Sequence, residues 1–204
     1  MIDIHSHILP EQDDGSKSLE ESVEMLVMAR ASGTTDIVAT PHANSEFRFD
    51  PAEVEQKIAQ LQKAVGGLPR IHYGCDFHLT PENIEDALGS PGKYSINHRG
   101  YLLVEFADTF IPKATSQIFE RMLDADLHPI ITHPERNALL QKRLPDLESW
   151  VEMGCLIQVT ASPIESGDLR VYGAHEARRS HCFDDRESLG KLSGGLRKFT
   201  ARRI

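Results

Sequence analysis

The sequence predicts an α/β protein with parallel strands, and two observations support this fold class. Short apolar segments alternate with longer segments that carry helix-capping residues and helical spacing of their apolar side chains. Such alternation favours a parallel sheet covered by helices on both faces. Histidine and carboxylate side chains also recur where the predicted strands end, and parallel α/β folds assemble their active sites at that edge.

Six strands are expected, each from a short apolar run bounded by turn residues. They span residues 2–4, 36–39, 70–75, 101–104, 129–132 and 156–159. Helices are expected between them, over residues 18–32, 51–65, a short stretch from 80, 114–125 and 144–153.

The first helix has the clearest local signals. Ser18 and Glu21 form a capping box, with Ser18 at the N-cap and Glu21 at N3. Helical spacing predicts that Val23, Leu26 and Val27 face the core.

The composition is that of a globular protein, with 204 residues of which 40% are hydrophobic and 26% charged. A net charge of -9 argues against a nucleic-acid partner. No apolar run is long enough to enter and cross a membrane, and the start of the chain does not read as a signal peptide. Three widely spaced cysteines do not suggest a disulfide framework, so a cytoplasmic protein is expected. Ten histidines is a high number for this length.

His5 and His7 are the first pair of candidate metal ligands. Side chains on a strand repeat with period two, so both imidazoles are expected on one face at the end of the first strand. Two imidazoles on one face suit a metal ion. The alternative is a pair of surface histidines, and further ligands at other strand ends decide between the two.

Such ligands follow the other strands, and they are His42, Asp76, Glu105 and His133. Asp14, in the loop after the first strand, is a further candidate. Pro41 cannot pair in a sheet, so His42 is expected on the loop just beyond its strand. A carboxylate such as Glu105, directly after four apolar residues, is costly to bury without a partner. Each has a structural alternative: His42 and Asp76 as turn residues, and Asp14 as a turn-ordering residue whose role Asp13 could take instead.

Histidine and carboxylate ligands without cysteine favour Mn, Fe or Zn in a hydrolytic site, and ligands from several strands imply more than one ion. Arg136 could hold a phosphate through its planar guanidinium, or could instead pair with Glu135. A metal-dependent phosphoester hydrolase follows. The chain has no Cys-x5-Arg phosphate loop, which excludes a thiol-based phosphatase. His72, His78, His98 and His128 are expected to be surface or structural residues.

The composition of the chain changes near residue 168, and from there to the end Lys and Arg outnumber Asp and Glu. We expect a domain over residues 1–165 and a divergent, poorly ordered basic tail over 166–204.

Five motifs together resemble the PHP (polymerase and histidinol phosphatase) superfamily. They are Asp3-Ile4-His5-Ser6-His7, the segment Asp13-Asp14-Gly15-Ser16-Lys17-Ser18-Leu19-Glu20-Glu21-Ser22, Thr40-Pro41-His42, Leu103-Val104-Glu105-Phe106 and Thr132-His133-Pro134-Glu135-Arg136-Asn137. Within it, the chain is similar over about residues 1–162 to the bacterial manganese-dependent tyrosine phosphatases of the CpsB/YwqE type.

This resemblance implies a distorted, TIM-like (β/α)7 PHP barrel with up to three Mn2+ ions, for which Fe or Zn could substitute. His5 and His7 would bind one ion, and Asp76, at a position where the family often has glutamate, would bridge to a second. Glu105 and His133 would complete that second set. Asp14 and His42 would bind the third ion, and Arg136 would contact phosphate.

The resemblance also implies a function. The substrate would be phosphotyrosine, notably on the tail of a tyrosine autokinase of capsule and exopolysaccharide biosynthesis, with metal-bound hydroxide as the attacking group. Oligomerisation is compatible with this function.

The chain departs from the family at its end, because no Asp-x-His motif on a final strand follows Ser162. The resemblance therefore implies a barrel incomplete at its C-terminal end and impaired activity. Two alternatives stay open: a small-molecule PHP phosphoesterase of the histidinol-phosphatase kind, and a catalytically impaired binding partner.

Overall fold

The structure is a computed structural model that describes residues 1–160. The strand segments are β1 (Ile2–Ser6), β2 (Asp36–Ala39), β3 (His42–Ala43), β4 (Arg70–Tyr73), β5 (Asp76–His78), β6 (Tyr101–Glu105), β7 (His128–Thr132) and β8 (Leu156–Gln158). The α-helices are α1 (Leu19–Ala31), α2 (Pro51–Val65), α3 (Pro81–Gly89), α4 (Thr115–Asp124) and α5 (Leu144–Met153), and short 3-10 turns are η1 (Ile96–His98), η2 (Pro134–Arg136) and η3 (Leu140–Lys142).

The strands form two sheets in the orders β1-β2-β4 and β3-β5-β6-β7-β8, and every pairing is parallel. This confirms the predicted parallel α/β class. Only Thr40 and Pro41 separate β2 from β3, and only Gly74 and Cys75 separate β4 from β5. The Asp76 amide donates to the Pro41 carbonyl at 3.0 Å, which ties the second sheet to the first at this break.

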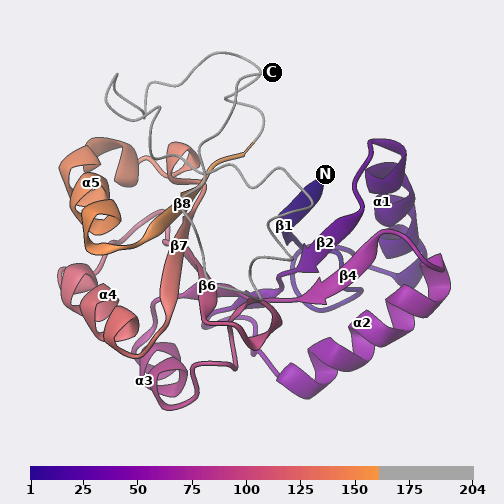
Figure 1. Ribbon diagram of the computed structural model, residues 1–204, viewed down its shortest axis with the longest axis horizontal. Helices are drawn as coiled ribbons and strands as arrows, with labels where there is room; N and C mark the ends of the chain where they lie inside the picture. The colour runs from indigo at the N-terminus through magenta and orange to yellow at the C-terminus, as the bar shows by residue number, and fades with distance from the viewer. Residues whose placement is uncertain (161–204) are drawn as a thin grey trace.

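The helices lie outside the strands. Figure 1 shows α1 and α2 beside β1, β2 and β4, and α3, α4 and α5 beside β6, β7 and β8. Ser18 caps α1 by accepting from the Glu21 amide at 3.2 Å, as predicted. The prediction that Val27 faces the core is wrong, because its side chain is 58% exposed while Leu26 is fully buried.

Strand alternation divides the buried side chains into two clusters. The larger one packs between strands and helices, and includes Ile37, Leu102 and Val104. The smaller one lies on the other face of the strands and comprises Ile2, Ile4, Val38, Ile96, Leu103 and Ile130. Because the first strand and the late strand β7 both contribute to this small inner cluster, the strands curve around it.

The predicted boundary at residue 165 and the basic tail over 166–204 lie outside the described residues. Within residues 1–160, no helix combines the length and the apolar character that a membrane crossing requires.

Candidate metal centre

Asp76 is at the centre of a group of histidines and carboxylates at the carboxyl ends of the strands. It lies in β5 and is fully buried. Its Oδ2 atom is 3.2 Å from His5 Nε2, 3.9 Å from His7 Nε2 and 3.3 Å from His42 Nδ1. The parallel strands therefore bring four of the predicted residues together at this edge.

The sequence predicted that His42 lies on a loop, but in the structure it lies in a strand. It begins β3, a two-residue strand that pairs with β5, with His42 opposite Asp76. Pro41 interrupts the strand, as expected of a residue without an amide hydrogen, but pairing resumes at the next residue. The short strand fixes His42 beside Asp76.

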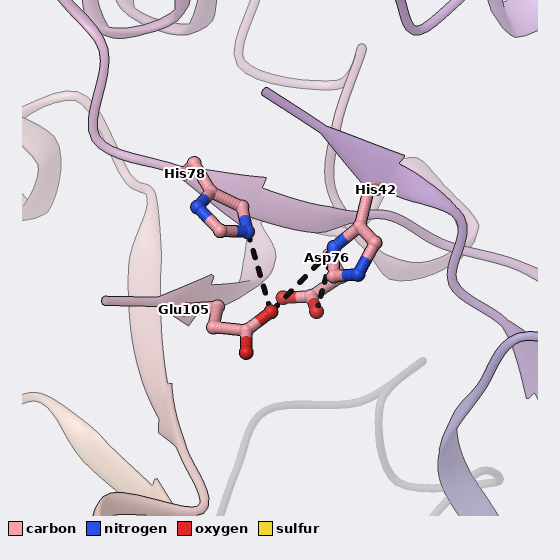
Figure 2. Close-up of side chains that lie close together, drawn as sticks. All are labelled: His42, Asp76, His78 and Glu105. Carbon is pink, nitrogen blue, oxygen red and sulfur yellow. Dashed lines mark ion pairs between the residues drawn. The ribbon is translucent and has the colours of Figure 1, made fainter. Parts of the chain in front are cut away.

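Glu105 ends β6 and directs its two carboxylate oxygens to different histidines. Oε1 is 3.5 Å from His133 Nε2. Figure 2 shows the contacts of Oε2, which is 3.5 Å from His42 Nδ1 and 3.2 Å from His78 Nε2. The expectation that His78 is a surface or structural residue is therefore not supported by its position. Its side chain lies within the cluster.

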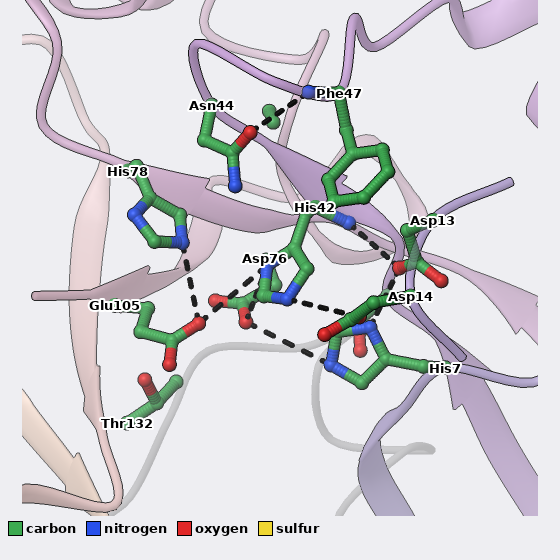
Figure 3. A network of polar contacts seen from close by, with 12 residues as sticks. His7, Asp13, Asp14, His42, Asn44, Phe47, Asp76, His78, Glu105 and Thr132 are labelled. Atoms are coloured by element: carbon green, nitrogen blue, oxygen red, sulfur yellow. Dashed lines mark hydrogen bonds and ion pairs between the residues drawn. The ribbon is translucent and has the colours of Figure 1, made fainter. Parts of the chain in front are cut away.

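Asp13 and Asp14, between which the sequence left a choice, occupy different positions. Asp13 is buried, and its Oδ2 accepts from His7 Nδ1 at 2.6 Å and from the His42 amide at 3.0 Å (Figure 3). Asp14 is 68% exposed, and its Oδ1 is 3.5 Å from His42 Nε2. Asp13 thus orients His7 and leaves its Nε2 pointing at Asp76, whereas Asp14 borders the cluster from the solvent side.

Gln158 is a site residue that sequence reasoning missed. Its Oε1 atom lies 3.4 Å from His5 Nδ1 and accepts from the His133 amide at 3.3 Å. From its position at the end of β8, Gln158 therefore orients both His5 and His133. The sequence signal was a polar side chain between Ile157 and Val159, at the carboxyl end of an apolar strand.

Arg136 is exposed and ends η2, the short turn that begins directly after His133. No ion pair joins it to Glu135 within the described residues; Glu135 Oε1 instead accepts from the Thr160 amide and hydroxyl at 2.9 and 2.8 Å. His133 has φ 28°, a left-handed conformation that is strained for a residue with a side chain. This turn places the charge of Arg136 close to the histidine.

The cluster perturbs the acid–base behaviour of its members. Burial lowers the pKa of His42, but the carboxylates of Asp76 and Glu105 outweigh it and raise this pKa to about 9. Burial likewise opposes ionisation of Asp76, yet the His42 and His5 rings hold its pKa well below the usual value. Burial lowers the pKa of His133 against the opposing charge of Glu105, and the charges of His5 and Arg136 act in the same direction as burial. Strong perturbation in a cluster of this kind is typical of functional sites.

Several buried polar atoms of the cluster have no hydrogen-bond partner among the described residues. They are His42 Nδ1, Asp76 Oδ1, His78 Nε2 and Glu105 Oε2. Unpaired buried polar atoms are unfavourable, and buried carboxylates require a compensating cation. Imidazole nitrogens and carboxylate oxygens that face one another are the ligand set of divalent transition metals. The residues present therefore fit metal ions.

Three ligand groups meet the distance requirement for an ion, with one atom from each residue within 4.8 Å of the others. They are His42, Asp76, His78 and Glu105; His5, His7 and Asp76; and His7, Asp14 and His42. His7, His42 and Asp76 each belong to two of these groups, so the three groups form one continuous cluster of candidate ligands.

The fold and the site define a class: parallel α/β proteins with a cluster of histidines and carboxylates at the strand carboxyl ends. Residues 1–173 match the family described as capsular polysaccharide synthesis, CpsB/CapC. The chain belongs to this family.

Two known proteins illustrate the relationship. CapC of Staphylococcus aureus is 36% identical over 170 residues, which cover 80% of this chain and 66% of CapC. The tyrosine-protein phosphatase YwqE of Bacillus subtilis is 33% identical over 172 residues, which cover 80% of this chain and 66% of YwqE. The chain thus spans just under two thirds of the length of these relatives.

A similar fold has been solved. A chain from the crystal structures of YwqE from Bacillus subtilis and CpsB from Streptococcus pneumoniae, which are metal-dependent tyrosine phosphatases, superposes with a TM-score of 0.74. It is 32% identical in sequence, and the match covers 80% of this chain and 68% of the solved one.

Proposed function

We propose that this protein is a metal-dependent protein-tyrosine phosphatase. The observation that carries this proposal is the meeting of histidines and carboxylates from β1, β3, β5 and β6 around the buried Asp76. The names of the relatives support the substrate class, because YwqE and CpsB are tyrosine-protein phosphatases.

The ligand sets that we propose follow the family resemblance. His5, His7 and Asp76 would hold one ion, and Asp76 would also serve a second ion together with Glu105 and His133. Asp14 and His42 would hold a third. Mn2+ is the proposed metal, and Fe or Zn have the same ligand preferences at such a site. Bound ions of this kind activate water and offset the charge that develops on phosphate.

The remaining groups position these ligands and the substrate. Asp13 and Gln158 engage the Nδ1 atoms of His7 and His5, which leaves each Nε2 free to face an ion. Arg136 would bind the phosphate through its guanidinium, because it is exposed, lies in the turn that follows His133, and forms no ion pair within residues 1–160.

The finer architecture is also a proposal: a TIM-like PHP barrel of the (β/α)7 type, in a domain over residues 1–165. The curvature around the small inner cluster supports it, as does the contact of β1 with β8 through His5 and Gln158.

The family description supports a role in capsule or exopolysaccharide synthesis. We propose that the substrate is the phosphotyrosine tail of a tyrosine autokinase in the cytoplasm. Self-association of the phosphatase is compatible with this role.

The test compares two substrates across metal additions. A phosphotyrosine peptide and histidinol phosphate are each incubated with the full chain after chelation and after addition of Mn2+, Fe2+ or Zn2+. Metal-dependent hydrolysis of the peptide, well above that of histidinol phosphate, is expected. Preference for histidinol phosphate would instead support a small-molecule phosphoesterase.

A second candidate function is a phosphotyrosine-binding protein with impaired catalysis. The observation behind this candidate is that residues 163–204 contain no Asp-x-His motif. Fewer than three bound ions together with peptide binding but no turnover would support it, while three ions and normal turnover would exclude it.

A further inference from the structure

We propose that His78 is a direct metal ligand, which with His42, Asp76 and Glu105 forms a cation site of two imidazoles and two carboxylates. The inference rests on the proposed metal dependence. It adds His78 to the ligands and places His42 Nδ1 with Asp76 and Glu105, instead of in the third-ion set. The resemblance gave His78 no role, and the sequence interpretation placed it among surface or structural residues.

Strand register places the four residues on one face. In β5, Asp76 and His78 are two residues apart and share a face. Phe77 points the other way and is fully buried in the larger cluster between strands and helices. His42 of β3 is paired opposite Asp76, and Glu105 of β6 is paired opposite His78. Three adjacent parallel strands therefore present these side chains side by side.

The distances between the ligand atoms suit one ion. His78 Nε2 is 3.2 Å from Glu105 Oε2, which is 3.5 Å from His42 Nδ1, and this nitrogen is 3.3 Å from Asp76 Oδ2 (Figure 2). Ligand atoms about 2.1 Å from a tetrahedral ion lie about 3.4 Å from one another. The separations are close to those that a coordinated ion requires.

A simple ion pair accounts less well for His78. Its Nε2 and Glu105 Oε2 are both buried, and neither has a partner with hydrogen-bond geometry among the described residues. The backbone of His78 is fixed independently, since its carbonyl accepts from the Thr80 amide at 2.8 Å and from Asn83 Nδ2 at 3.1 Å. The side chain is thus held towards the cluster by the strand.

The chemical consequence concerns metal preference. A second imidazole beside two carboxylates gives more nitrogen coordination than a carboxylate-rich site, and imidazole suits Zn and Fe better than it suits Mn. We expect removal of His78 to weaken Zn2+ binding more than Mn2+ binding.

The test measures metal binding to the full chain, independently of activity. His78→Gln and His78→Ala are compared with wild type by calorimetric titration with Zn2+ and Mn2+, and by the absorption spectrum of the Co2+-loaded protein. His128→Gln is the matched control, because His128 also lies on a strand but at the amino end of β7. Both His78 variants should bind one Zn2+ at least tenfold more weakly and show an altered Co2+ spectrum, while the control should match wild type.

Glutamine keeps a hydrogen-bond donor, so it separates ligation from positioning. Wild-type affinity and an unchanged Co2+ spectrum in His78→Gln would overturn the proposal, even if His78→Ala is weakened. Circular dichroism of the metal-free variants establishes that they are folded. Equal metal binding by wild type and variant would overturn the role of His78 alone. A wild-type chain that binds no metal would overturn the proposed function itself.

Discussion

Asp36 and Asp76 are both buried strand residues with histidines beside them, but they lie at opposite ends of the strands and have different partners. At the amino end of β2, Asp36 accepts from Arg70 Nε at 2.6 Å and from the Thr35 hydroxyl at 2.8 Å, and its Oδ1 lies 3.0 Å from His72 Nε2. At the carboxyl end, Asp76 is surrounded by His5, His7 and His42, and its Oδ1 has no partner among the described residues.

The difference separates an ion-paired site from the candidate metal centre. The charge of Asp36 is balanced by a permanent cation, because an arginine keeps its charge at any physiological pH. Around Asp76 the described ion-pair partners are histidines, which can exchange a proton for a metal ion. The same fold therefore has a self-contained ion pair at one end of its strands and a ligand cluster at the other.

The largest effect is expected from Asp76→Asn, which tests whether the carboxylate at the carboxyl end of the strands binds metal. Loss of the carboxylate that several histidines share should reduce phosphotyrosine hydrolysis about 10³-fold or more, since metal stabilisation of the transition state contributes several kcal/mol. Metal analysis should also show fewer bound ions. Added Mn2+ should raise the thermal midpoint of wild type but not of this variant. A variant with full metal content and normal turnover would contradict the role of Asp76.

Asp36→Asn tests the opposite end. It should lower the free energy of unfolding by about 2 kcal/mol, because hydrogen bonds to a charged group are lost and their donors remain. Urea unfolding in the presence of a chelator measures this change. Metal content and the Mn2+-induced rise in thermal midpoint should stay at wild-type values, and a loss of metal binding would show that the two ends are coupled.

Asp13→Asn tests orientation of a ligand without removing one. The Asp13 carboxylate contacts His7 Nδ1 at 2.6 Å, and weakening this contact should reduce metal affinity about 10–100-fold. Asp124→Asn, on the exposed surface of α4, is the matched control and should leave affinity unchanged. Calorimetric titration with Mn2+ distinguishes the two variants; equal affinity in both would rule out an orienting role.

The smallest effect concerns pH. The Arg70 and His72 contacts overcome burial and lower the pKa of Asp36, so the unfolded chain binds a proton more readily than the folded one. The stabilisation is fully present above the unfolded value of about 3.9 and is lost as pH falls through the lower folded pKa. The difference in unfolding free energy between wild type and Asp36→Asn should narrow as pH falls from about 5 to about 2. Urea unfolding of both proteins at a series of pH values measures this difference, and a constant difference across that range would contradict the role of the Asp36 carboxylate.

Local sequence patterns predicted most of the secondary structure. The Ser18 capping box, the helix over Pro51–Val65 and the strand over Asp36–Ala39 all occur in the structure as expected. These signals act within a few residues of the chain, through capping hydrogen bonds, a fixed proline φ and side-chain periodicity. They need no knowledge of distant segments.

His78 shows where such reasoning failed. The sequence placed the end of the third strand at Cys75, so the alternation that linked His5 with His7 was not extended to Asp76 and His78. In the structure, pairing stops after Tyr73 and resumes at Asp76, which restores the two-residue spacing on one face. The interruption lies at Gly74, where a side chain would meet Val38 Cγ1 at 2.5 Å, so close packing of the strands requires glycine there.

By itself, the sequence determined the parallel α/β class and the presence of His5, His7, His42, Asp76, Glu105 and His133 near strand ends, because periodicity and residue chemistry are local properties. Tertiary structure alone decided which of these side chains face one another. It added His78 and Gln158, gave Asp13 and Asp14 separate positions, and left Arg136 free of Glu135. The physical reason is that contact across a parallel sheet depends on register between segments far apart in the chain, which no single segment encodes.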